Sequence, residues 1–142
     1  NLEYFCQGVA HPSVQLNPVE LPTRRITSVP LAGDKITHGE ITFTIILDEN
    51  MTGYNEMFNW LQRLVNDGQV NPIARNTKFP TYADITLAIL SSHNNTTQKI
   101  RYKDCLPTGL GAINFITTTG SVTYLTFDAT FRFSQFEIIA QT

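Results

Sequence analysis

The chain has 142 residues, of which 42% are hydrophobic and 15% charged, and its formal net charge is −2. This length allows one domain with a real core, and the composition excludes an intrinsically disordered chain. The weak negative charge gives no basic footprint for a nucleic acid. No apolar run approaches the roughly 18–20 residues that span a bilayer. We therefore expect one domain over residues 1–142 and no membrane partner.

The first 35 residues predict extended chain. Side chains alternate from Leu2 to Cys6, so a strand is already running and we expect the N-terminal strand to be incomplete. Residues 8–35 carry four prolines, each of which fixes φ and removes a backbone donor. This predicts a long connection of extended segments and turns, with short edge strands near 13–16 and 24–29.

The clearest elements lie between residues 41 and 65. Apolar and polar side chains alternate from Ile41 to Leu47, which predicts a half-buried strand that the acidic residues after it end. Asn50 or Thr52 is a suitable N-cap for a helix that ends before Gly68. Its expected core stripe, drawn from apolar side chains three and four residues apart, contains Met57, Phe58, Trp60, Leu61, Leu64 and Val65.

The C-terminal half reads as antiparallel strands. Residues 82–91 and 98–105 predict a hairpin across a polar turn, and residues 106–111 interrupt the pattern. A short strand over 112–117 and a long strand over 122–133 follow. The predicted fold is mainly β: an antiparallel sandwich or partly closed barrel with one packed α-helix.

No strong catalytic or ligand-binding pattern is present. Ser92 and His93 adjoin in a polar turn without a third orienting group, and the three histidines share no metal-ligand spacing. Cys6 and Cys105 are expected to be small buried or half-buried thiols, with a disulfide left open. We expect no enzyme activity, no catalytic residues, no metal and no cofactor.

The order of these features resembles the tail-tube proteins of contractile-tailed bacteriophages. The resemblance rests on FCQGVAHPS from Phe5, PLAGDK at Pro30–Lys35, the alternating strand with an acidic stop, and the helix with Trp60. The segment DCLPTGLGAINF and a long aromatic strand ending near Phe136 complete it. The resemblance covers nearly the whole chain, and its specificity lies in the order and spacing of loose motifs.

The resemblance implies six copies in a ring and rings stacked into a hollow tube, with tail sheath and baseplate proteins as partners. Phage DNA would pass through the lumen without specific binding, and the protein would be part of the virion after assembly in the host cytoplasm. The lumen candidates are Glu40, Thr42, Thr44, Asp48, Thr126, Asp128, Thr130 and Arg132. The candidate inter-subunit loop contains Pro22, Arg24, Arg25, Pro30, Asp34 and Lys35.

Alternatives remain at this point. Arg24 and Arg25 are either solvated charges or partners of acidic groups on a neighbouring subunit. Within the tube class, a baseplate protein that initiates the tube or a ring of a secretion system has the same strand pattern. A β-sandwich module that binds carbohydrate or protein is an alternative of a different class, although most aromatic side chains lie at core positions.

Overall fold

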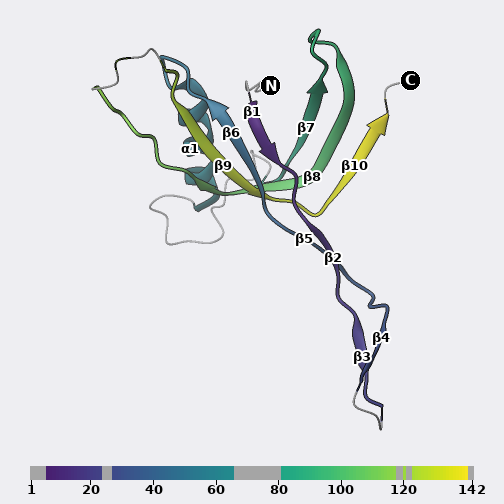
Figure 1. Cartoon of the computed structure of the whole chain (residues 1–142). Coiled ribbons are helices and arrows are strands. Elements are labelled where there is room, and N and C mark those ends of the chain that lie inside the picture. Colours follow the sequence, from purple (N-terminus) through teal and green to yellow (C-terminus); the bar gives the residue numbers. More distant parts are fainter. Residues whose placement is uncertain (1–5, 24–26, 66–80, 118–119, 121–122, 141–142) are drawn as a thin grey trace.

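The computed structural model describes residues 6–23, 27–65, 81–117, 120 and 123–140 (Figure 1). Its elements, in chain order, are β1 (Cys6–Ala10), β2 (Val14–Leu16), β3 (Val19–Leu21), β4 (Val29–Leu31), β5 (Ile36–His38), β6 (Ile41–Ile46), α1 (Thr52–Val65), β7 (Ala83–Leu90), β8 (Thr96–Leu110), β9 (Thr126–Arg132) and β10 (Gln135–Ala140). The predicted class, mainly β with one packed helix, is confirmed.

Six strands form one curled antiparallel sheet, in the order β1-β6-β9-β8-β10 with β7 paired to β8. The long strand β8 joins the two parts of this sheet, because its first half pairs with β7 and β10 and its second half with β9. Asp104, with φ 55°, lies where β8 changes partners. In Figure 1 the two parts diverge like an open V, with α1 beside β6 and β9.

Two predictions about this region were wrong. We expected residues 106–111 to interrupt the strand pattern, but β8 continues to Leu110. Pro107 is tolerated there because the register to β9 shifts between Pro107 and Gly109, and proline is accommodated at such irregularities. The expected short strand over 112–117 is absent, since these described residues form no strand.

The predicted long strand over 122–133 is shorter than expected, and a further strand follows it. The strand β9 spans Thr126–Arg132, while residues 121 and 122 lie outside the described part of the chain. Ser134 then turns the chain: its N–H donates to the Lys103 carbonyl at 3.1 Å, and its hydroxyl lies 3.1 Å from the Asp104 carboxylate. The strand β10, which we did not predict, continues along β8 beyond this corner.

The core lies between α1 and the sheet. The buried side chains are Ile41, Phe43, Ile45, Met57, Tyr102, Cys105, Phe127, Ala129 and Phe131. Tyr54 packs edge-on to Phe127, with ring centroids 5.5 Å apart, and Trp60 lies 6.0 Å from Phe131. No helix in the described part of the chain has the length and apolar character needed to cross a membrane.

The predicted helix stripe was too wide. Met57 is 2% exposed and Trp60, Leu61 and Leu64 are half-buried, but Phe58 is 45% and Val65 82% exposed. Successive helical residues are rotated by about 100°, so Phe58 and Val65 lie at the flank of the face that Met57 centres. These two residues are therefore corrected from core to surface.

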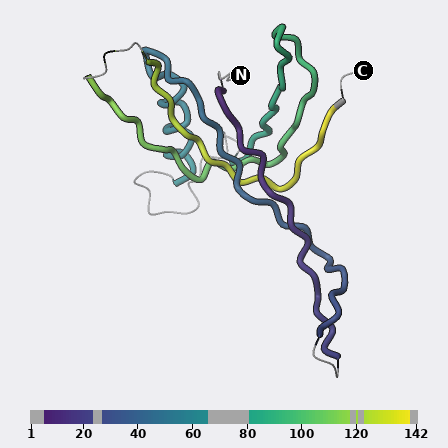
Figure 2. The backbone as a smooth tube through the Cα atoms, in the orientation of Figure 1, coloured from purple at the N-terminus to yellow at the C-terminus, as the bar shows by residue number. Residues whose placement is uncertain are grey.

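Residues 13–23 and 27–39 form a two-stranded arm, which we did not predict as such. The strand β2 pairs with β5 and β3 with β4, continuing the hairpin of β1 and β6 away from the sheet (Figure 2). The expected edge strand near 13–16 matches β2, whereas β3 and β5 were missed. In the other expected strand, 24–29, residues 24–26 lie outside the described chain, and β4 begins at Val29. The predicted strand over 2–6 likewise lies outside it except for Cys6, where β1 begins.

Candidate functional site

The sheet face opposite the helix is polar where β6 and β9 pair. Thr44 lies opposite Asp128 and donates a hydrogen bond of 2.8 Å to its Oδ1. Thr42 lies opposite Thr130, with their hydroxyl oxygens 3.4 Å apart. Five of the predicted lumen residues therefore share one ladder face, with Arg132 at its end: Thr42, Thr44, Thr126, Asp128 and Thr130.

Small residues flank this polar face on both sides, on β1 and just after the end of β8. Gly8 and Ala10 on β1 lie opposite Thr44 and Thr42. On the other side, the Gly111 N–H donates to the Asp128 carbonyl at 2.6 Å, and a Cβ at Gly111 would lie 3.1–3.3 Å from Asp128 atoms. The face therefore has low relief. Our sequence analysis missed these flanking residues, because which strands adjoin β6 and β9 is not a local property of the sequence.

The remaining two lumen candidates lie at the ends of the β6 ladder. Glu40 is exposed and precedes the buried Ile41, so alternation places it on the polar side. Asp48 instead caps α1: its Oδ2 accepts from the Thr52 N–H at 3.1 Å and its Oδ1 from the Gly53 N–H at 3.4 Å. Hydrogen bonds from the Thr52 side chain and backbone lower the pKa of Asp48. Its structural role was missed, since we expected Asn50 or Thr52 to provide the cap.

The arm carries a large exposed apolar surface. Seven side chains between 46% and 61% exposed lie on its four strands: Val14, Leu16, Val19, Leu21, Val29, Leu31 and Ile36. Leu16 pairs with Ile36 across the ladder, so both are on one face, while the neighbouring pair Gln15 and Thr37 is on the other. An exposed apolar surface of this extent marks an interaction site.

The predicted inter-subunit residues also lie in the arm, except for two that cannot be placed. Arg24 and Arg25 lie outside the described residues. Pro22 follows β3, and Pro30 in β4 pairs with Glu20. Asp34 and Lys35 are exposed in the connection between β4 and β5. The apolar residues of the arm were missed as a surface because the prolines around them led us to expect irregular chain.

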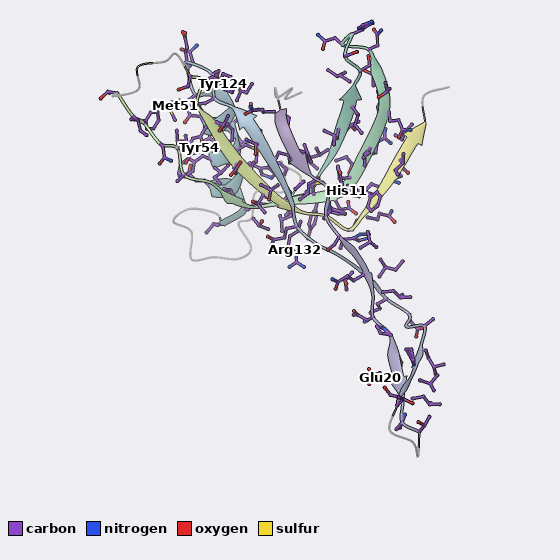
Figure 3. The ribbon with its side chains drawn as sticks, in the orientation of Figure 1. His11, Glu20, Met51, Tyr54, Tyr124 and Arg132 are labelled. Atoms are coloured by element: carbon purple, nitrogen blue, oxygen red, sulfur yellow. The ribbon has the colours of Figure 1, made fainter. Side chains whose placement is uncertain are left out.

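Two histidines lie where the arm meets the sheet: His11, between β1 and β2 (Figure 3), and His38, at the end of β5. The His11 Nδ1 lies 2.9 Å from the hydroxyl of the fully buried Tyr102, and the His11 ring meets Phe136 edge-on at 4.8 Å. His38, at the end of β5, packs on Phe133 at 5.2 Å and on Phe136 at 5.6 Å. The buried His38 Nδ1 has no hydrogen-bond partner among the described residues. Burial, with a smaller effect of Cys105, raises the pKa of Tyr102.

Reactive side chains form no developed site in the described residues. Ser92 Oγ and His93 Nδ1 are 3.4 Å apart, but both residues are exposed in the turn between β7 and β8. Among the described residues, no group of three or more histidine, cysteine, aspartate or glutamate side chains is placed to hold a metal ion. Both cysteines are free; Cys105 is buried as expected, but Cys6 is exposed, which corrects the expectation for that thiol.

Comparison with known proteins points to one family. A family model described as phage tail tube protein matches residues 1–139. A search of curated proteins found no match.

Solved structures share this fold at low sequence identity. A chain of the anti-feeding prophage baseplate has a TM-score of 0.67 and 12% identity, covering 96% of this chain and 81% of that one. A chain of the PVC sheath–tube complex, from an extracellular contractile injection system, gives 0.67 and 17% with the same coverage. Hcp1 from Flavobacterium johnsoniae gives 0.57 and 13%, covering 97% and 88%.

Proposed function

Because the chain belongs to the phage tail tube protein family, we propose that it is the ring-forming subunit of a hollow tube in a phage-like contractile particle. Six copies close a ring, rings stack into the tube, and DNA passes through the lumen during infection. The particle is a virion or a related extracellular injection particle, assembled in the host cytoplasm. Sheath and baseplate proteins are its partners, in line with the sheath–tube and baseplate structures that share the fold.

The observation that carries this proposal is the arm. It extends away from the sheet, so its apolar side chains lie far from the core that buries Ile41 and Phe43 (Figure 2). Leaving such side chains in water is unfavourable by roughly 25 cal/mol per Å² of apolar surface. A neighbouring copy of the chain would remove this surface from water, which makes the arm the expected contact between subunits of adjacent rings.

The sheet supports closure of a ring. Among the described strands, β1 has β6 as its partner, while β7 and β10 each pair with β8. Strand edges of this kind present backbone N–H and C=O groups that pair with another chain. Lateral pairing of such edges between six copies would form a continuous barrel, which removes the edges.

The two faces of the β6–β9 ladder suggest which side lines the lumen. Threonine hydroxyls and the Asp128 carboxylate form the face away from α1, and the small residues beside them leave it low in relief. Neutral and acidic groups hold phosphate weakly or repel it, which suits transit of DNA without binding. With this face towards the lumen, α1 faces outwards, where a sheath would lie.

The test is electron microscopy of the purified chain, together with its mass in solution. Six-fold rings and stacked hollow tubes are expected for the unaltered chain. The double substitution Leu16→Ser/Ile36→Ser removes a facing apolar pair from the arm and is expected to abolish stacking. The matched control is Gln15→Ser/Thr37→Ser, one register position away on the opposite arm face, which is expected to stack normally.

Two results would count against this function. Equal stacking of the apolar and control variants would show that the apolar pair of the arm does not contribute to the contact between rings. A chain that stays monomeric even with a tail baseplate supplied would exclude the tube subunit itself.

A role at the end of a tube, or in a secretion-system ring, is the second candidate. The likeness to a chain of the anti-feeding prophage baseplate favours a role at the end of a tube. The same micrographs separate the two roles, because a tube subunit extends into long tubes once seeded, whereas an initiating or terminal subunit stops at one or a few rings.

A further inference from the structure

We propose that His11 and His38 form a proton-sensitive latch at the root of the arm. With both rings neutral, they hold Phe136 between them and fix the direction of the arm; proton uptake releases it. This inference rests on the proposed function of the arm as the contact between subunits. It adds a control on that contact: the tube is joined firmly near neutral pH and loosens in mild acid.

The two histidines contact the same phenylalanine, and each comes from one of the two segments that form the arm. His11 lies between β1 and β2, and His38 ends β5. Each of the two segments that lead from the sheet into the arm therefore carries one imidazole. Their ring centroids are 4.8 and 5.6 Å from that of Phe136. Phe133 and Phe136 stand on either side of the corner at Ser134, where β9 gives way to β10. The arm therefore rests on the corner between β9 and β10.

The Tyr102 hydroxyl can donate its proton to His11 only when Nδ1 of the His11 ring carries no proton. Tyr102 is completely buried, and burial raises its pKa, so its hydroxyl retains a proton to donate. A neutral His11 accepts that proton at Nδ1 over 2.9 Å. When Nδ1 itself carries a proton, it becomes a donor, and the Tyr102 hydroxyl must direct its own proton into the core. Protonation of His11 thus replaces a satisfied buried donor with an unsatisfied one.

His38 has a buried ring nitrogen without a partner. Its Nδ1 is buried and has no hydrogen-bond partner among the described residues. A neutral imidazole leaves a bare lone pair there, whereas an imidazolium places an N–H donor and a charge without an acceptor. The ring of Phe133, 5.2 Å away, attracts a cation but accepts no conventional hydrogen bond.

Among the described residues, neither imidazole forms an ion pair with an acidic side chain that would offset this charge. On β8 and β10 the residues of this face are Tyr102 and Phe136, which pair with each other. The charged residues at the neighbouring positions are Glu40, Arg101, Lys103, Asp104, Arg132 and Glu137. The Asp104 carboxylate lies 3.1 Å from the Ser134 hydroxyl. Alternation places Arg101, Lys103 and Glu137 on the face opposite Tyr102 and Phe136. On that face Glu137 is paired with Arg101 at 3.5 Å and with Lys103 at 3.0 Å.

The experiment measures the arm directly in the full-length chain. Spin labels are attached at Glu20→Cys in the arm and Gln98→Cys in the sheet, in a Cys6→Ser background. Pulsed electron paramagnetic resonance then measures the distance between the two labels. Histidine changes charge between about pH 5 and 8. We expect one narrow distance distribution at the upper end of this range and a broad one at the lower end, reversibly.

The variants assign the effect to the two histidines. His11→Gln keeps an acceptor for the Tyr102 hydroxyl, and His38→Phe keeps the aromatic packing, and neither side chain titrates. The double variant is expected to give the narrow distribution at both pH values. His93→Gln, which removes the exposed histidine of the β7–β8 turn, is the matched control and is expected to broaden like the unaltered chain.

Two results would overturn the latch. One is a distribution of the unaltered chain that does not change with pH; the other is a double variant that still broadens in acid. A variant-free measurement guards against misfolding, because proton NMR contacts between the His38 ring and Phe136 should vanish on acidification of the unaltered chain. Tube assembly at neutral pH is scored separately. Normal tubes with a pH-independent arm would reject the latch and leave the proposed function standing.

Discussion

The carboxylate of Asp48 accepts a hydrogen bond from the backbone N–H of Thr52, at the point where the helix begins. Between them, Met51 adopts φ 52°, and its own N–H donates to the Asp48 carbonyl at 3.0 Å. One acidic side chain thus satisfies donors that the first helical turn leaves free, and it does so from the segment that ends β6. The cap fixes where α1 starts relative to the sheet.

Loss of this cap is expected to destabilise the domain. Asp48→Ala should lower the melting temperature at neutral pH, because the Thr52 and Gly53 donors lose their acceptor. Glu49→Ala, at the adjacent exposed position, is the control and should have little effect. The fold lowers the pKa of Asp48, so its stabilisation is present above the ordinary value of 3.8 and is lost as pH falls through the lower folded value. Equal melting temperatures of the two variants at neutral pH would show that the Asp48 cap does not stabilise the domain.

The docking of α1 on the sheet depends most on Met57. This side chain is 2% exposed, and it is the buried residue of the helix. Met57→Ala should reduce the free energy of unfolding by about 2–5 kcal/mol, since a cavity remains where the thioether packed. Val65→Ala, at 82% exposure, should change it by less than about 0.5 kcal/mol. Urea unfolding curves would measure both free energies. Similar losses of stability in the two variants would contradict the assignment of Met57 to the core and Val65 to the surface.

Local patterns were enough to predict β6 and α1. The alternation from Ile41 to Ile45 reflects one buried and one polar face, and the spacing of Met57, Leu61 and Leu64 reflects one buried helix side. Each pattern arises within a single element, so the sequence carries it without knowledge of partners.

The arm and the bent strand β8 depend on distant partners. Val14 pairs with His38, and Leu106 with Arg132, so their conformations are set by chain that is remote in sequence. Pro107 and Gly109 are signs of a break when viewed locally, but here they occupy an irregular ladder. The polar face was anticipated from β6 and β9 separately, whereas its low relief needed the neighbours β1 and β8.

The connection between β4 and β5 requires the absence of a side chain at Gly33. A Cβ at this position would overlap the carbonyl oxygen of Asn17 on the facing chain. Gly33→Ala should therefore distort the arm and impair stacking in the micrographs, while the free energy of unfolding changes by less than about 0.5 kcal/mol because the core is remote. Gly39→Ala is the control, since its Cβ would make only ordinary contacts of 3.5–3.7 Å with Pro12 and Ser13. Normal stacking of Gly33→Ala would show that the arm adapts.

Cys105 is expected to make the domain sensitive to alkali. Burial raises the pKa of this thiol from 9.0 to about 11. A group whose pKa is raised by folding binds its proton more tightly in the native state, so its stabilisation is complete below pH 9.0 and is lost as pH rises towards 11.

Unfolding of the unaltered chain and of Cys105→Ala should therefore be compared by urea titration across this range. The advantage of the unaltered chain at neutral pH should shrink by at most about 1.4 kcal/mol per pH unit. Cys6 titrates in both proteins and cancels, so the difference between the two curves reports Cys105 together with its smaller effect on the pKa of Tyr102. A difference that stays constant from neutral pH to pH 11 would mean that the folded protein releases the Cys105 proton as readily as the unfolded chain.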